Sequence, residues 1–163
     1  MSATGGSYTT SYDSTKMGDG PEAEAADATR DSVRGIARIA DSVESYDRIL
    51  DSYDSEHNGV TFCQGNFAAM GVDIPETIRH FDEKITFAHF RDVEGDADRF
   101  VETWHDDGPT DMQAAMNAFV DAGFEAPIRP DHVPTMSGED NSNPGYNTKR
   151  RLFAIGYMRR LLE

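Results

Sequence analysis

The chain has 163 residues, with 30 acidic residues against 15 lysines and arginines and a net charge of −15. This length suits one domain with its own core, but it is short for a closed (β/α)₈ barrel, which needs about 250 residues. The negative charge repels phosphate groups, so neither nucleic acids nor anionic membranes are expected partners.

The acidic residues are spread along the chain, and lysine is rare. This pattern predicts a cytosolic protein of a salt-loving organism, in which salt screens the self-repulsion. Cys63 is the only cysteine, so no intrachain disulfide can form and a reducing compartment fits. No apolar run approaches the roughly 18 residues of a membrane span, and the N-terminus lacks a signal-peptide pattern. We therefore expect a soluble, cytoplasmic protein.

In chain order, residues 1–32 come first, and they are rich in Gly, Ser, Thr, Ala and acidic residues. We expect a disordered tail there, because such a segment buries little apolar surface. Residues 33–163 form the expected domain, in which helices and strands alternate. The expected helices span residues 43–53, 74–81, 110–122 and 147–162, and the expected strands span 59–62, 84–88 and 126–129. This order predicts an α/β fold with a parallel sheet and helical crossovers.

Further expectations concern the segments between and after these strands. Residues 63–67 (CQGNF) are predicted to be a Gly/Asn loop. Residues 91–109 are predicted to be a long acidic excursion, whose HDDGPTD run is either a solvated loop or an active-site lid. Apolar stripes at helical spacing predict the core-facing residues of the last two helices. These are Met112, Ala115, Met116 and Phe119 on the third, and Leu152, Phe153, Ile155, Met158 and Leu161 on the fourth.

A residue that can bind a metal or titrate stands at the end of each expected strand. These residues are Cys63, His89, and the adjacent pair Asp131 and His132. Because parallel strands end at one edge of a sheet, we expect these side chains to converge. A thiolate, an imidazole and a carboxylate together suit Mn²⁺, Fe²⁺ or Zn²⁺. Taken singly, Cys63 is more typical of a small buried residue than of a ligand, and His89 is more typical of a strand-end histidine with one hydrogen bond.

The loop after the last strand, residues 129–146, adds Pro/Gly turns and Tyr146 to this edge. The plain alternative is a solvated aspartate with a loop histidine. Arg91 follows His89 closely and could hold a substrate carboxylate through two hydrogen bonds, although a surface ion pair fits the sequence equally well. His57, His80 and His105 lie in a turn, at a helix end and in the acidic excursion, and they have weaker claims.

Several stretches carry a resemblance to a known family: NGVTFCQGNF, ITFAHFRDV, VETWHDDGPTDM and PIRPDHVPTMSGEDNSNPGYNTKRRLFAIGYMRRLLE. From Arg34 to Leu162 the chain resembles the C-terminal half of mannonate dehydratase, which has a xylose-isomerase-like TIM barrel. The resemblance implies dehydration of D-mannonate to 2-keto-3-deoxy-D-gluconate in hexuronate catabolism. It also implies a partial TIM barrel with parallel strands over residues 33–163.

The same resemblance implies roles for individual residues. Cys63, His89 and Asp131 match the family's metal ligands, usually for Mn²⁺ or Fe²⁺. His132 and Tyr146 match its acid–base pair, without showing which residue is the acid and which the base. Proton abstraction next to a carboxylate builds negative charge that a cation stabilises, so these residue types fit the chemistry.

The chain also departs from the family pattern. A fourth ligand, a histidine in a His-Pro-Asp-Asp stretch, is expected just before Gly35, but Ala28–Val33 (ATRDSV) contains no histidine. The N-terminal half-barrel has no counterpart, so the chain looks truncated, and we expect the chain alone to bind metal weakly and to turn over mannonate slowly or not at all. The alternatives are a non-catalytic remnant, a subunit that pairs with a separately encoded N-terminal half, or a sugar isomerase of the same superfamily. A homo-oligomer is a further expectation.

Overall fold

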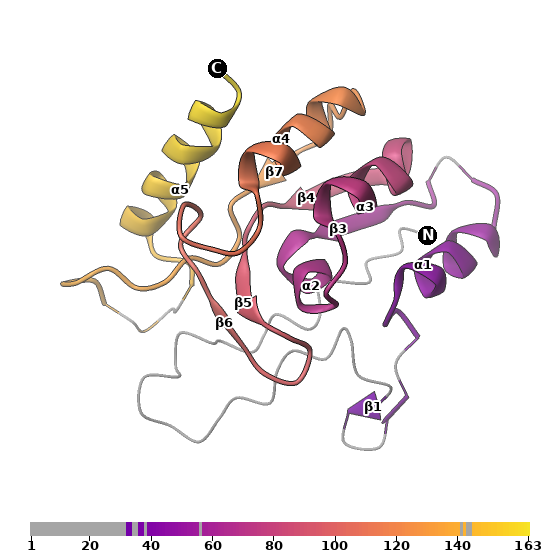
Figure 1. Cartoon of the computed structure of the whole chain (residues 1–163), viewed down its shortest axis with the longest axis horizontal. Helices are drawn as coiled ribbons and strands as arrows, with labels where there is room; N and C mark the ends of the chain where they lie inside the picture. The colour runs from indigo at the N-terminus through magenta and orange to yellow at the C-terminus, as the bar shows by residue number, and fades with distance from the viewer. Residues whose placement is uncertain (1–31, 34–35, 38, 56, 141, 143–144) are drawn as a thin grey trace.

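The computed structural model describes residues 32–33, 36–37, 39–55, 57–140, 142 and 145–163. The expected disordered tail, residues 1–32, therefore lies almost wholly outside the described residues. Within them the central feature is a sheet of three strands in the order β3 (Val60–Cys63), β4 (Ile85–His89) and β7 (Ile128–Arg129) (Figure 1). Both neighbouring pairs are parallel, which confirms the predicted α/β fold.

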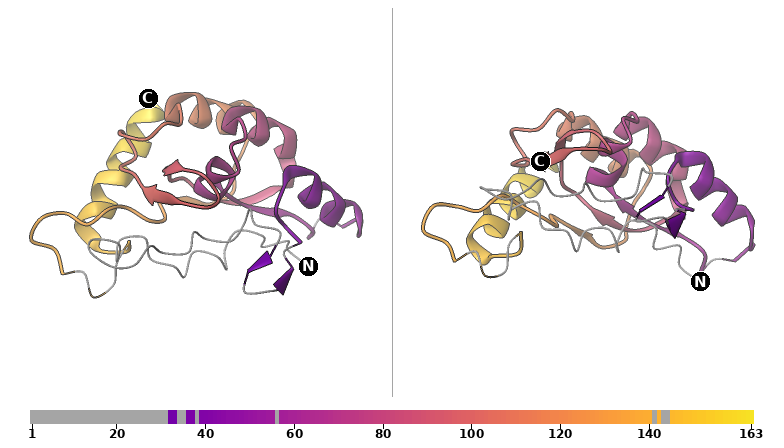
Figure 2. Two further views of the ribbon diagram at one scale, coloured as in Figure 1. Left: turned by 60° about the horizontal axis from the view of Figure 1, so that its bottom comes forward. Right: turned by 90° about the horizontal axis from the view of Figure 1, so that it is seen from below.

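Helices pack mainly against one face of this sheet. They are α1 (Val43–Asp51), α2 (Gln64–Ala69), α3 (Ile74–Phe81), α4 (Met112–Asp121) and α5 (Thr148–Leu161), with a 3₁₀ turn η3 (Asp82–Lys84) before β4. Figure 2 shows α3 and α4 side by side over the sheet, with α5 beyond α4 on the β7 side. The sheet is open at both ends of the described order, so the described residues do not close a barrel.

Capping residues fix where these helices begin. The side chains of Ser42, Asp73 and Asp111 each accept a hydrogen bond from a backbone N–H in the first turn of α1, α3 and α4. Pro75 stands in the first turn of α3, where its missing N–H costs nothing. The predicted bounds of these helices are therefore right to within about two residues, the usual fraying of helix ends.

The core lies between the sheet and the covering helices. Phe62 stacks on Phe67 with ring centroids 4.5 Å apart, and it meets Phe119 edge to face at 5.8 Å. The predicted α4 stripe is confirmed, because all four of its residues are buried in this cluster. Tyr46 of α1 is also fully buried, and the partly buried Leu50 packs against the cluster.

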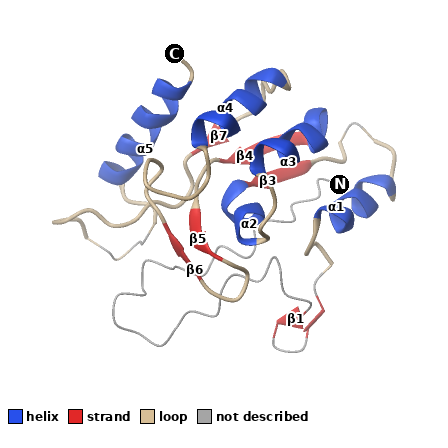
Figure 3. Cartoon of the chain, in the orientation of Figure 1, coloured by secondary structure: helices blue, strands red, loops and turns tan. Residues whose placement is uncertain are grey.

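Two predicted loops contain regular structure instead. The CQGNF run enters α2 directly from β3, with Gln64, Gly65 and Asn66 buried. The acidic excursion folds back as an antiparallel hairpin of β5 (Val93–Gly95) and β6 (Phe100–Glu102), which continues beyond the carboxyl end of β4 (Figure 3). Two further short strands, β1 (Ser32–Val33) and β2 (Ile36–Ala37), pair antiparallel.

The predicted inner face of α5 is partly wrong. Met158 is buried, but Leu152 is 64 % and Ile155 44 % exposed. The reason is geometric, since α5 lies beyond the last strand of the sheet and only one side of it meets α4. In the part of the chain that the structure describes, no helix is long and apolar enough to cross a membrane.

Candidate active site

Three metal-competent side chains meet at the carboxyl ends of the parallel strands. Cys63 ends β3 and pairs in register with His89 at the end of β4, which in turn pairs with Arg129 of β7. Asp131 follows two residues later with a positive φ of 55°, a conformation that few residues other than glycine adopt. Each of Cys63, His89 and Asp131 offers one ligand atom, and these three atoms lie within 4.8 Å of one another. All three residues are buried.

The ionisation states of this trio suit a divalent cation. Burial lowers the pKa of His89 to about 4, against the opposing effect of Asp131, so its imidazole is neutral at pH 7. Its Nδ1 is buried and has no hydrogen-bond partner among the described residues; it lies 3.7 Å from the Asp131 carboxylate. Burial by itself raises the pKa of Asp131, but Arg91, His132 and His89 outweigh it and lower the pKa to about 2. A free imidazole nitrogen beside a carboxylate and a thiol is a donor set for a borderline divalent metal.

The thiol of Cys63 is protonated in this environment. Burial raises its pKa, and the nearby Arg91 guanidinium only partly offsets that effect. A thiol coordinates a metal only as the thiolate. Metal binding at this site therefore requires the loss of one proton from Cys63.

His132 and Tyr146 form a close pair beside the trio. The His132 Nε2 lies 2.6 Å from the Tyr146 hydroxyl, which is also 3.5 Å from the Asp131 carboxylate. Burial and the charge of Asp131 raise the pKa of Tyr146 to about 12, so the phenol keeps its proton. Gly145 has a φ of 78°, and a Cβ there would lie 3.0 Å from the His132 ring, so this turn requires glycine.

Glu102 of β6 completes this pair, and the sequence interpretation did not single it out. Its carboxylate lies 3.2 Å from the His132 Nδ1 and accepts two hydrogen bonds from Arg91, at 2.7 and 2.8 Å. On strand β6, Phe100 and Glu102 share one face and the exposed Val101 lies on the other. Three residues are too few for this alternation to identify Glu102 from the sequence.

Arg91 is fully buried and joins the two halves of the site. Its Nε donates to Asp131 at 3.1 Å, and its Nη1 donates to Glu102. Its Nη2 donates to Asn66 at 3.0 Å and to the Cys63 sulfur at 3.5 Å. All the N–H groups of a guanidinium thus face acceptors within the protein. These contacts exclude the surface ion pair, and they favour a positioning role for Arg91 over a grip on a substrate carboxylate.

The other histidines lie outside this cluster. His80 is exposed and pairs with Asp47 at 2.8 Å. His105 is buried, unlike a residue of a solvated loop, and its Nε2–H donates to the Phe90 carbonyl at 2.7 Å. That hydrogen bond fastens the excursion to the end of β4.

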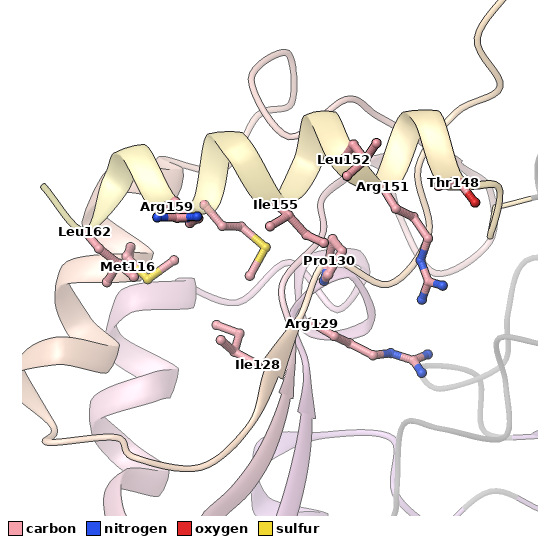
Figure 4. Close-up of a pocket in the computed structure, with 11 residues that line it drawn as sticks. Met116, Ile128, Arg129, Pro130, Thr148, Arg151, Leu152, Ile155, Arg159 and Leu162 are labelled. Carbon is pink, nitrogen blue, oxygen red and sulfur yellow. The ribbon is translucent and has the colours of Figure 1, made fainter.

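A groove of about 600 Å³ runs between β7 and α5, next to the site. We call it the β7–α5 groove; it is lined by Met116, Ile128, Arg129, Pro130, Thr148, Arg151, Leu152, Ile155, Met158, Arg159 and Leu162. Figure 4 shows that its two ends differ. Met116, Ile128 and Leu162 gather at one end, whereas the guanidinium groups of Arg129 and Arg151 extend toward the other.

Comparisons with known proteins agree with this geometry. The family model for D-mannonate dehydratase (UxuA) matches residues 23–163, starting inside the stretch that was assigned to the tail. Mannonate dehydratase of Enterococcus faecalis is 38 % identical over 133 residues, covering 79 % of this chain and 37 % of that protein. The enzyme of Brachyspira hyodysenteriae is 40 % identical over 135 residues, covering 80 % and 38 %. The chain thus spans about two fifths of the length of these curated relatives.

Solved structures give the same result. The mannonate dehydratase of Streptococcus suis serotype 2 superposes with a TM-score of 0.75 at 34 % identity, covering 81 % of this chain and 39 % of that one. A D-tagatose 3-epimerase-like protein superposes with a TM-score of 0.57 at 18 % identity, a likeness of fold alone. With a family model that matches nearly all of the described residues, the chain belongs to the D-mannonate dehydratase family.

Proposed function

We propose that this chain carries a mannonate dehydratase site, which removes water from D-mannonate to give 2-keto-3-deoxy-D-gluconate. The observation that carries the proposal is the meeting of the Cys63, His89 and Asp131 trio with the His132–Tyr146 pair at one edge of a parallel sheet. Membership of the family supports the same reaction.

We propose that Cys63, His89 and Asp131 hold Mn²⁺ or Fe²⁺. A bound divalent cation acts as a Lewis acid and stabilises the negative charge that develops when the proton next to the substrate carboxylate is removed. His89 offers a neutral nitrogen and Asp131 an ionised carboxylate at neutral pH. Because the stretch expected to supply a fourth ligand lacks a histidine, we expect weaker metal binding and slow turnover by the chain alone.

The hydrogen bonds support His132 as the base and Tyr146 as the acid. The Glu102 carboxylate, paired with Arg91, accepts from Nδ1 of His132, so in the neutral ring Nε2 is the acceptor nitrogen and the Tyr146 hydroxyl donates to it. Nε2 takes the C2 proton, and the Tyr146 hydroxyl protonates the departing C3 hydroxyl, which leaves as water. The remaining enol tautomerises to the 2-keto acid. The 2.6 Å hydrogen bond then returns the proton from His132 to Tyr146 and restores both groups.

Proton NMR of D-mannonate in D₂O, with the chain and added Mn²⁺, tests this proposal. We expect the 2-keto-3-deoxy acid to form, and a chelator to stop the reaction. The C2 proton is the informative signal, because its exchange for deuterium reports the base even where dehydration is slow. The proposal would be contradicted if no product formed and the C2 proton did not exchange.

A second candidate is a subunit that acts with a separately encoded polypeptide. The observation that favours it is the exposure of Leu152 and Ile155 along the β7–α5 groove, beside the open edge of β7. Apolar side chains in a groove are typical of surfaces that another chain covers. Analytical ultracentrifugation of the wild type and of a Leu152→Glu, Ile155→Glu double variant tests whether this surface associates.

We further propose that the protein works in the cytoplasm of a cell with high internal salt. The single cysteine and the excess of acidic residues over lysine and arginine support this setting.

A further inference from the structure

Two arginines from different elements lie close to the ring of Tyr146. The Arg129 guanidinium, at the end of β7, lies 5.8 Å from the ring centroid, and that of Arg151, on α5, lies 5.3 Å from it. Both side chains extend to the same end of the β7–α5 groove in Figure 4. Neither is deeply buried: the Arg129 side chain is 38 % exposed, and Arg151 is half-buried.

These guanidinium groups retain unused hydrogen-bonding capacity. Arg129 pairs with Asp131 through Nη2, but its Nε is buried and has no acceptor among the described residues. Within the same part of the chain Arg151 has no carboxylate partner, and the Tyr146 ring is its only contact of this kind. Arg91 differs from both, because its donors are fully engaged.

The balance of charge around Tyr146 and His132 is positive. Three guanidinium groups, those of Arg91, Arg129 and Arg151, lie near two carboxylates, those of Asp131 and Glu102. In the whole chain, by contrast, acidic residues outnumber lysine and arginine two to one. Both the Arg129 and the Arg151 guanidinium groups carry a positive charge near the same ring, and a bound anion neutralises part of that charge. A positive pocket on a negative molecule favours entry of an anionic ligand.

We propose that Arg129 and Arg151 form the subsite that binds the carboxylate of the sugar-acid substrate. This inference rests on the proposed dehydratase function and adds the residues that select an acid over a neutral sugar. The planar guanidinium fork suits bidentate binding of a carboxylate. A carboxylate held beside Tyr146 places the adjacent carbon next to the Tyr146 hydroxyl and the His132 Nε2, where the proton is to be removed.

Equilibrium binding of D-mannonate, measured by calorimetry on the Mn²⁺-loaded chain, tests the subsite. The variants are Arg151→Gln, Arg151→Lys and Arg129→Lys, with neutral D-mannitol as the ligand that lacks a carboxylate. Arg160→Gln is the matched control, because Arg160 lies on the same helix, is exposed and does not line the groove. We expect Arg151→Gln to weaken mannonate binding at least about tenfold, the loss expected for a charge-assisted hydrogen bond, and to leave any mannitol binding unchanged. Lysine should restore part of the affinity, because it keeps the charge and loses the fork.

Wild-type mannonate affinity in Arg151→Gln, or equal loss of mannonate and mannitol binding, overturns the inference. Binding and turnover also separate the subsite from the proposed reaction. A chain that binds mannonate through Arg151 but forms no product and exchanges no C2 proton keeps the subsite and loses the dehydratase proposal. If Arg151→Gln turns over mannonate with an unchanged KM, the dehydratase proposal stands and the subsite is wrong. A wild-type chain that binds no sugar acid overturns both.

Discussion

Among single residues, the Glu102 carboxylate joins the two chemical parts of the site. It is hydrogen-bonded to His132 on one side and to Arg91 on the other, and Arg91 in turn contacts Asp131 and Cys63. The orientation of the His132 ring and the placement of the trio are therefore coupled through one guanidinium group. A shift in any one of these side chains is felt by the others, because their donors and acceptors are shared.

Removing the Tyr146 hydroxyl should affect the reaction and leave the fold intact. We expect Tyr146→Phe to lower kcat by about 10²–10⁴-fold, the usual contribution of a positioned acid or base. The hydroxyl lies 2.6 Å from His132 and is the group proposed to protonate the leaving hydroxyl. Steady-state kinetics with thermal melting as the control measure this. A kcat within threefold of the wild type at equal stability would show that Tyr146 is not the acid.

Neutralising Glu102 should destabilise the fold. Arg91 is fully buried, so in Glu102→Gln it loses one of its two charged partners and keeps only Asp131, and removing one member of a buried ion pair costs about 3–5 kcal/mol. Urea unfolding of this variant measures the change. Glu94→Gln is the matched control, because Glu94 lies on the other strand of the same hairpin and is exposed. Equal unfolding midpoints for the two variants would contradict the importance of the Arg91–Glu102 pair.

The sequence indicates some residues of the site and hides others for physical reasons. Cys63 and His89 could be placed together because parallel strands end at one edge, whatever the details of packing. Glu102 could not be placed at the site from the sequence, because it lies in a segment rich in charged residues, and the sequence does not show which of these are solvated and which are buried. The burial of Arg91 was equally hidden, since it depends on acceptors from three other elements.

Among the elements, the strands of the parallel sheet and the long helices were predictable, whereas helix α2 and the β5–β6 hairpin were not. Helix α2 was missed because it has six residues, starts without a spacer after β3 and contains Gly65. That glycine has a clear role, since a Cβ there would lie 2.5 Å from the Arg91 Nη1. The β5–β6 hairpin was missed because its strands have three residues each, too few for an alternating pattern to stand out.

The segment after β6 should make stability depend on pH through His105. Burial lowers the pKa of His105 below its usual 6.5, so as the pH falls the unfolded chain binds the proton first. Stability should therefore be full above about pH 6.5 and decline below it. Urea midpoints at pH 7.5 and 5.5 measure the decline, which should be shallower in His105→Gln. If the urea midpoint of His105→Gln depended on pH as steeply as that of the wild type, His105 would not be responsible. A smaller dependence on pH should remain in this variant, because the pKa of His89 is lowered as well.

For the whole molecule, the main feature that the sequence could not show is the surface left beside β7. The predicted inward face of α5 included Leu152 and Ile155. The structure instead leaves Leu152 and Ile155 exposed along the β7–α5 groove. Amphipathic spacing identifies an apolar face, but it does not identify which neighbour that face meets.

The net charge of −15 should make stability depend on salt. Raising KCl from 0.1 to 1 M shortens the Debye length from about 10 to about 3 Å and screens repulsion among the exposed carboxylates. We expect the melting temperature to rise by several degrees over this range and then to level off. A melting temperature that stays constant or falls would contradict a stability limited by self-repulsion.

The most direct test of the proposed site is a Mn²⁺ titration followed by electron paramagnetic resonance, without reference to activity. The wild-type chain should bind one Mn²⁺, and Cys63→Ala should weaken that binding at least about tenfold, because changes at and around metal ligands have effects of that order or larger. His80→Ala, which removes an exposed histidine outside the cluster, should bind like the wild type. An unchanged affinity in Cys63→Ala would contradict the assignment of Cys63, His89 and Asp131 as the metal ligands.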